Sequence, residues 1–162
     1  MKYLFVYIFC ILSTSLYSQY EIDSLLQKYN DQTVPYISVQ ELKKDAHSYL
    51  ILDTRKKKEF EISHIPNAIW GSEKVDLKNP AFAKAKKNQP IVVYCSVGIR
   101  SEDYGEHLKK LGYSNVKNLY GSIFAWKDAG YNLINSKGKR TDSVHVFSRK
   151  WGNYLNSGIK VY

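Results

Sequence analysis

The stretch Ile91-Val92-Val93-Tyr94-Cys95-Ser96-Val97-Gly98-Ile99-Arg100-Ser101 decides the fold class of this chain. Its first four residues form an unbroken apolar run rich in β-branched side chains, which is typical of a strand buried on both faces of a sheet. Residues 101–111 then place apolar side chains at helical spacing, and Gly112 follows as a helix stop. A buried strand that leads through a short loop into a helix predicts an α/β domain.

Short apolar runs alternate with amphipathic segments on both sides of this stretch, throughout residues 36–133. Ser38 and Glu41 have the spacing of a capping box and predict the start of a helix that runs to Lys44. The alternation favours a mostly parallel sheet covered by helices. The other predicted elements are strands at residues 49–52, 68–70 and 116–119 and a helix at residues 122–129.

The N-terminal residues have a different composition. Lys2 is followed by an uncharged apolar run and then by small and polar residues, which is the pattern of a secretory signal peptide. We expect cleavage after Ser18 and export to the periplasm or the exterior; the alternative is an uncleaved N-terminal anchor helix. The predicted division of the chain is a signal peptide at 1–18, an N-terminal helical extension at 19–34, the α/β domain at 35–135 and a C-terminal extension at 136–162.

The cysteine content and the net charge limit the kinds of chemistry and the kinds of partner that we expect for this protein. The chain has two cysteines, and Cys10 leaves with the signal peptide, so Cys95 has no partner for an intramolecular disulfide. Cys95 is then either an inert core residue or a reactive thiol. The net charge of +9 comes from lysines scattered over the chain, with no aromatic or recognition-helix pattern among them. We therefore expect no nucleic-acid partner, and no membrane span once the signal is removed.

The loop after the predicted strand has the features of a reactive-cysteine site. Cys95 lies at the carboxyl end of a strand, where open α/β sheets bind their ligands. A tight loop that opens a helix directs backbone N–H groups towards one point, and Gly98 permits the necessary backbone dihedral angles. The positive charge of Arg100 favours thiolate over thiol. The sequence thus predicts a Cys95 thiol with a lowered pKa.

Three ordered motifs resemble the rhodanese family, over about residues 37–133. Residues 52–55 (Leu-Asp-Thr-Arg), with Glu59-Phe60 and residues 64–68 (His-Ile-Pro-Asn-Ala), resemble its first signature, and residues 94–101 resemble its active-site loop. A third set of residues resembles the family's closing signature: Tyr120-Gly121, Ala125-Trp126 and Ala129-Gly130-Tyr131. The chain departs from the family at three positions where glycine is common, namely Ser63, Asn67 and Ser122.

The resemblance implies a rhodanese-like fold, with a mostly parallel five-stranded sheet and helices on both faces. It also implies a sulfurtransferase in which Cys95 takes a sulfane sulfur from thiosulfate, a polysulfide or a persulfide and passes it to a thiol or cyanide, or to a protein acceptor. No metal or organic cofactor is needed for these steps. Cys95 and Arg100 are the expected catalytic residues, and the expected substrate-binding residues are Ser96, Val97, Gly98, Ile99, Ser101, Asp53 and Arg55.

Four polar residues of the first signature match family positions and have a mainly structural interpretation: Asp53, Arg55, Glu59 and His64. Arg55 and Glu59 are four residues apart, so we expect them to pair across one helical turn. His64 is expected to hold a loop, and Asp53 and Arg55 are the members of this set most suited to line the pocket. In the C-terminal extension, the aromatic residues Trp151, Tyr154 and Tyr162 are expected to pack on the domain, with a partner surface as the alternative.

Two rival functions use the same residues. A non-catalytic module can keep the rhodanese fold for binding or sulfur carriage. Phosphatases and arsenate reductases also combine cysteine and arginine in one loop, but their loop is a residue longer, to surround a tetrahedral oxyanion. Here four residues separate Cys95 from Arg100, which favours a single sulfur atom as the bound group.

Overall fold

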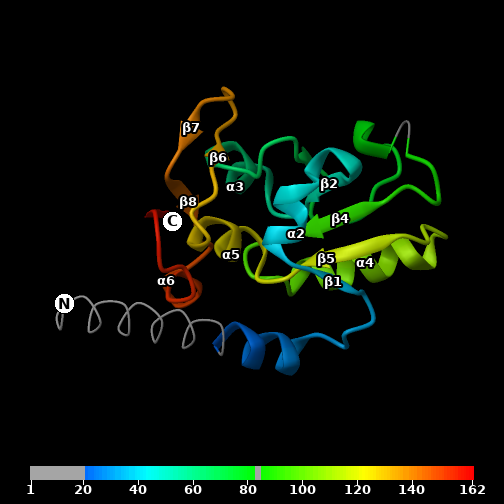
Figure 1. The fold of residues 1–162 in the computed structure, drawn as a ribbon, viewed down its shortest axis with the longest axis horizontal. Helices are drawn as coiled ribbons and strands as arrows, with labels where there is room; N and C mark the ends of the chain where they lie inside the picture. Colours follow the sequence, from blue (N-terminus) through cyan, green and yellow to red (C-terminus); the bar gives the residue numbers. More distant parts are fainter. Residues whose placement is uncertain (1–20, 83–84) are drawn as a thin grey trace, which may run out of the picture.

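The computed structural model describes residues 21–82 and 85–162 (Figure 1). A five-stranded sheet lies at its centre in the order β1-β5-β4-β2-β3, and every neighbouring pair of strands is parallel. The predicted α/β class and the five-stranded sheet are therefore confirmed. The strands are β1 (Tyr36–Ile37), β2 (Leu50–Asp53), β3 (Ile69–Trp70), β4 (Ile91–Tyr94) and β5 (Val116–Leu119).

Strand β4 is apolar at every position because both of its faces are covered. Val92 and Tyr94 belong to one hydrophobic cluster, whereas Ile91 and Val93 belong to the other, as expected when successive side chains point to opposite faces. Helix α4 contributes to the second cluster through residues such as Leu108, and α2 and α5 contribute to the first. Helices thus cover both faces of the sheet.

Helices α2, α4 and α5 begin within one residue of where the sequence predicts them. The helices are α2 (Val39–Lys44), α3 (Lys57–Ile62), α4 (Arg100–Lys110), α5 (Ser122–Asp128) and α6 (Arg149–Gly152), with short 3₁₀ turns at Ala46–Ser48 and Pro80–Phe82. The capping box of α2 is present: Glu41 N–H donates to Ser38 Oγ at 3.2 Å, and Ser38 N–H donates to Glu41 Oε2 at 2.9 Å.

The N-terminal extension is helical over residues 21–29, and the helix ends before the predicted Val34. Its apolar face, which includes Leu25 and Leu26, packs into the first hydrophobic cluster. The predicted signal peptide at residues 1–18 lies outside the described residues. Among the helices that the structure describes, none has the length and apolar character needed to cross a bilayer.

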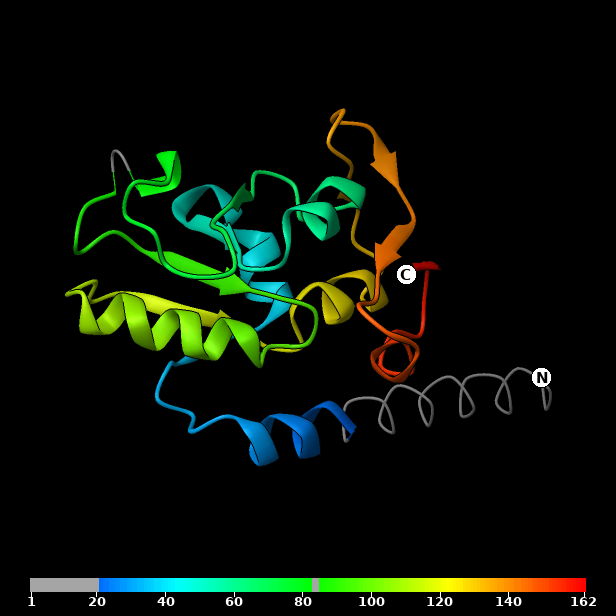
Figure 2. The same cartoon turned by 180° about the vertical axis from the view of Figure 1, so that it is seen from behind.

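The C-terminal extension folds back on the domain (Figures 1 and 2). Its first strand, β7 (Arg140–Thr141), pairs antiparallel with β6 (Leu133–Ile134) at the end of the domain. The extension also contains the parallel pair β8 (Ser143–His145) and β9 (Ile159–Val161). Trp151 and Tyr154 pack against the first hydrophobic cluster, as expected, whereas Tyr162 stays exposed. Strand β8 lies beside α3, the helix that follows β2 in the chain.

Candidate active site

Cys95 is the first residue after β4, and the loop of residues 96–99 leads directly into α4 (Figure 2). The residue exposes 1% of its surface, so its sulfur lies at the base of the loop and not on the molecular surface. The loop turns at Gly98, whose φ of 117° lies in the region that favours glycine. The predicted strand, loop and helix are thus all present around Cys95.

Helix α5 holds the backbone on the other side of Cys95. Cys95 N–H donates to Ser122 Oγ at 3.1 Å, and Ile123 N–H donates to the Cys95 carbonyl at 3.3 Å. Ser122 has a φ of 52°, so it keeps the left-handed backbone expected of the glycine that is common at this position in the family. Its hydroxyl adds a hydrogen-bond acceptor for Cys95 that glycine does not have.

The environment of Cys95 favours the thiolate. Burial raises the pKa of the thiol, but the positive charge of Arg100 and hydrogen bonds from Gly98 and Ser101 outweigh it, so the pKa lies below its ordinary value. Gly98 N–H donates to Cys95 Sγ at 3.2 Å. A buried thiol with a lowered pKa is a candidate nucleophile.

Arg100 is held by a buried carboxylate. Its two terminal nitrogens donate to the two oxygens of Glu59 at 3.1 and 3.0 Å, and Nη2 also donates to Ser96 Oγ at 3.1 Å. Burial raises the pKa of Glu59, but the hydrogen bond and charge of Arg100, together with the charge of Arg55, outweigh it and lower that pKa. This bidentate pair orients the cation whose charge lowers the pKa of Cys95.

The expected pair between Arg55 and Glu59 is wrong. Helix α3 begins at Lys57, so Arg55 precedes the helix and has no i,i+4 relation to Glu59 on its surface. Arg55 instead donates to both carboxylate oxygens of Asp53, with Nη2 at 2.6 Å from Oδ2.

Asp53 and Arg55 form a buried ion pair. Both side chains are fully buried, and Arg55 Nη2 also donates to the Ser63 carbonyl at 2.6 Å. Burial lowers the pKa of Arg55, but the charge and hydrogen bonds of Asp53 outweigh it and raise the pKa above its ordinary value. In this arrangement neither side chain is open to a ligand, and the pair fixes the chain between β2 and His64.

His64 has the surroundings of a structural residue. Its ring stacks on Phe60 with the ring centroids 3.9 Å apart, and Nδ1 lies 2.9 Å from the Phe60 carbonyl oxygen. Burial lowers its pKa more than the hydrogen bond to Phe60 raises it. These contacts fit the interpretation that His64 holds a loop.

Two asparagines that the sequence analysis missed hold the active-site loop. The Gly98 carbonyl accepts from Asn118 Nδ2 at 2.8 Å and from Asn30 Nδ2 at 3.0 Å. Asn118 Oδ1 accepts from Ser101 Oγ at 2.8 Å, which keeps this predicted substrate-binding hydroxyl inside the protein. Asn118 is a buried polar residue at the third position of β5 (Val-Lys-Asn-Leu), on the same face of the strand as Val116. Nothing in the local sequence marks Asn30.

The remaining loop residues divide into buried and partly exposed positions. Val97 is buried and packs in the first hydrophobic cluster, and Ser96 is buried with its hydroxyl on Arg100. Ile99 is partly exposed and packs against the edge of the same cluster. The groups that hydrogen-bond to the sulfur of Cys95 are the backbone N–H groups of Gly98 and Ser101 and the Ser101 hydroxyl.

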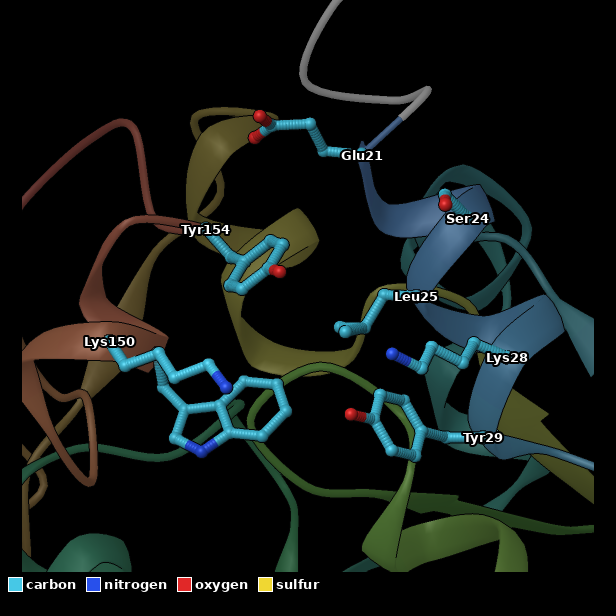
Figure 3. Close-up of a pocket in the computed structure, with 8 residues that line it drawn as sticks. Glu21, Ser24, Leu25, Lys28, Tyr29, Lys150 and Tyr154 are labelled. Atoms are coloured by element: carbon cyan, nitrogen blue, oxygen red, sulfur yellow. The ribbon is translucent and has the colours of Figure 1, made fainter.

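A pocket of about 400 Å³ lies elsewhere, between the N-terminal helix and α6 (Figure 3). Its wall combines lysines and aromatic rings, among them Lys28, Tyr29, Lys150 and Tyr154. None of its lining residues belongs to the loop of residues 95–100, so the pocket is separate from the Cys95 site.

Arg100→Met is expected to raise the pKa of Cys95, because it removes the cation and keeps an apolar side chain of similar length. We expect the rate of Cys95 alkylation by iodoacetamide at pH 7 to fall about tenfold or more, and the rate profile to move to higher pH. Arg149→Met is the matched control, since Arg149 lies in α6 and contacts Tyr162. An alkylation profile that stays in place in Arg100→Met contradicts this role of Arg100.

Comparison with known proteins agrees with this geometry. The family described as Rhodanese-like domain matches residues 38–129. The thiosulfate sulfurtransferase GlpE of Coxiella burnetii is 35% identical over 78 residues, which cover 48% of this chain and 71% of that protein. The tRNA uridine(34) hydroxylase of Chlamydia muridarum is 30% identical over 113 residues, 66% of this chain, but the match spans only 33% of the hydroxylase.

A solved structure is similar to this chain in its fold. The crystal structure of a thiosulfate sulfurtransferase from Pseudomonas aeruginosa superposes with a TM-score of 0.59 at 20% identity, over 85% of this chain and 26% of that one. At this identity the likeness shows the fold. Since the family match covers more than half of the sequence and the parallel sheet agrees with it, this chain belongs to the rhodanese-like domain family.

Proposed function

We propose that this protein is a sulfurtransferase that carries sulfane sulfur on Cys95. The observation that carries the proposal is the position of an almost fully buried thiol at the carboxyl end of a parallel strand, with the Gly98 N–H directed at its sulfur. Arg100, which Glu59 orients, lowers the pKa of this thiol. A thiol that only fills space in a core has a raised pKa, since burial penalises its charged form. Here Arg100 and the Gly98 N–H reverse that effect.

In the first step the Cys95 thiolate attacks the outer sulfur of thiosulfate. A new S–S bond forms at Cys95, the bond between the two sulfur atoms of thiosulfate breaks, and sulfite leaves with its electron pair. The product is a Cys95 persulfide anion, and the total charge is unchanged. The Gly98 N–H, which already points at Cys95 Sγ, and the positive charge of Arg100 stabilise this anion.

In the second step a thiophilic acceptor attacks the outer sulfur of the persulfide. Cyanide becomes thiocyanate, or a thiolate becomes a persulfide, and the Cys95 thiolate leaves and is ready for another cycle. The second step returns Cys95 to the thiolate, so the complete cycle leaves the oxidation state of the protein unchanged. The lowered pKa of Cys95 makes it a good nucleophile in the first step and a good leaving group in the second.

Intact-mass spectrometry of the reduced, full-length protein tests the proposal. We use the Cys10→Ser variant, so that Cys95 is the thiol present, and expose it to thiosulfate and then to polysulfide. The expected result is a gain of one sulfur atom that disappears when cyanide is added, with release of thiocyanate. Protein alkylated beforehand with iodoacetamide is the control. Folded, reduced protein that gains no sulfur from either donor contradicts the proposal and favours a binding module.

A further inference from the structure

Phe147 belongs to the C-terminal extension, outside the part of the chain that matches the family, yet it lies beside the candidate active site. It connects β8 with α6, and β8 runs beside α3 (Figure 1). The centre of its ring is 5.2 Å from Cζ of Arg100. The extension therefore contributes a side chain to the surroundings of the Cys95 loop.

The backbone at Phe147 is strained. Its φ is 64°, which non-glycine residues adopt rarely. Ser148 N–H donates to the Val146 carbonyl at 2.7 Å across Phe147, which is the pattern of a γ-turn, and with positive φ this turn is rare and strained. Strain of this kind persists only where the surrounding structure imposes it, and it is common at ligand-binding positions.

The two residues before Phe147 hold it in this conformation. Val146 is fully buried, and its N–H donates to the Val161 carbonyl at 2.9 Å. The N–H of Phe147 itself donates to Nδ1 of the buried His145 at 3.0 Å. Despite these buried neighbours, Phe147 is 47% exposed. The chain thus presents an apolar ring at the surface in a fixed position.

The ring lies close to two cations from different parts of the domain. Lys56 Nζ, at the start of α3, is 5.6 Å from the ring centre, in addition to Arg100 at the start of α4. Both distances are within the range of cation–π attraction. Two adjacent cations that are open to solvent attract a small dianion such as thiosulfate. Here the apolar ring of Phe147 lies against both cations, which makes the position less favourable for a dianion. The charge of Arg100 is also balanced by the bidentate ion pair with Glu59.

We propose that Phe147 is a specificity-determining residue that directs the Cys95 site towards organic persulfides and away from thiosulfate. The inference rests on the proposed sulfurtransferase function and names its donor class. The ring offers an apolar surface to the organic group R of a donor R–S–SH. The small outer sulfur atom of the donor is the part that reaches the buried Cys95. Thiosulfate has no apolar end, and the ring competes with its sulfonate oxygens for Arg100.

The sulfur transfer from such a donor is balanced. The Cys95 thiolate attacks the outer sulfur of R–S–SH, the bond between the two sulfur atoms breaks, and R–S⁻ leaves. The new bond gives Cys95–S–SH, so the charge and the number of protons are the same before and after the step. No oxidant, reductant or metal takes part.

The test compares the rates of Cys95 persulfidation by two probes, benzyl persulfide and thiosulfate, measured by intact mass on the full-length Cys10→Ser protein. Phe147→Gly removes the ring and suits the positive φ, so the fold is kept, which thermal unfolding checks. We expect the rate with thiosulfate to rise about fivefold and that with benzyl persulfide to fall about fivefold, as loss of a cation–π contact and of apolar packing implies.

Two further variants make the result specific. Phe147→Tyr keeps the ring and is expected to keep the wild-type ratio of the two rates. Tyr162→Ala removes another exposed ring of the same extension, which contacts Arg149, and is also expected to leave the ratio unchanged. A ratio that is the same in Phe147→Gly as in the wild type overturns the role of Phe147 while the sulfurtransferase function stands. A wild-type protein that accepts sulfur from neither probe overturns both.

Discussion

Cys95→Ser is expected to abolish sulfur transfer, with turnover from thiosulfate to cyanide reduced by about a thousandfold or more. The serine hydroxyl is not ionised at neutral pH, so it forms no bond to the outer sulfur of the donor. It still accepts a hydrogen bond from the N–H of Gly98, which lies 3.2 Å from the sulfur in the wild type. We therefore expect the fold to be retained. Thiocyanate formation and intact mass measure the loss, and thermal unfolding measures the fold.

The second cysteine of the chain supplies the matched control for this variant. Cys10→Ser removes one thiol, as Cys95→Ser does, but it leaves the loop after β4 intact. We expect Cys10→Ser to turn over like the wild type. If Cys95→Ser gained sulfur and passed it on while remaining folded, Cys95 would not be the carrier.

Arg55→Leu is expected to lower the free energy of unfolding by about 3–5 kcal/mol, because it leaves a buried carboxylate without its cation. Asp53 and Arg55 are both fully buried, and they are joined by several hydrogen bonds. The substitution also removes the donor to the Ser63 carbonyl. Chemical denaturation of the variant and the wild type measures the difference.

The double variant Asp53→Ala, Arg55→Leu separates the charge effect from lost packing. Because it contains no unpaired buried charge, we expect it to be more stable than Arg55→Leu alone. Lys58→Leu, at an exposed position of α3, is the surface control and is expected to change the stability by less than about 0.5 kcal/mol. A double variant no more stable than Arg55→Leu argues that loss of packing, and not the unpaired charge, causes the destabilisation.

Much of the fold follows from local patterns in the sequence. The apolar run at residues 91–94 is a strand with those bounds, and residues 116–119 are another. Ser38 and Glu41 form the predicted capping box. These features are predictable because strand periodicity, helix caps and glycine stops depend on residues that are close in sequence. The N-terminal helix is shorter than predicted: it ends at residue 29, the last apolar position of its helical stripe.

The candidate site was predictable where its parts are neighbours in the chain. Cys95 and Arg100 flank a single loop, so their spacing already implies that the cation lies near the thiol. The partners of this loop come from further away: Glu59 is 41 residues from Arg100, and Asn30 is 68 residues from Gly98. Sequence spacing instead suggested that Glu59 pairs with Arg55, which is wrong.

The sequence by itself determined the α/β class, the position of Cys95 at the end of a buried strand, and Arg100 at the start of the next helix. Only the tertiary structure decided that Glu59 binds Arg100 and that Asp53 and Arg55 form an ion pair. It also decided that the ring of Phe147 lies beside Arg100. The physical reason is the range of the interactions. Periodicity and capping act over a few residues, whereas ion pairs and ring contacts depend on which elements pack together, and that depends on the whole core.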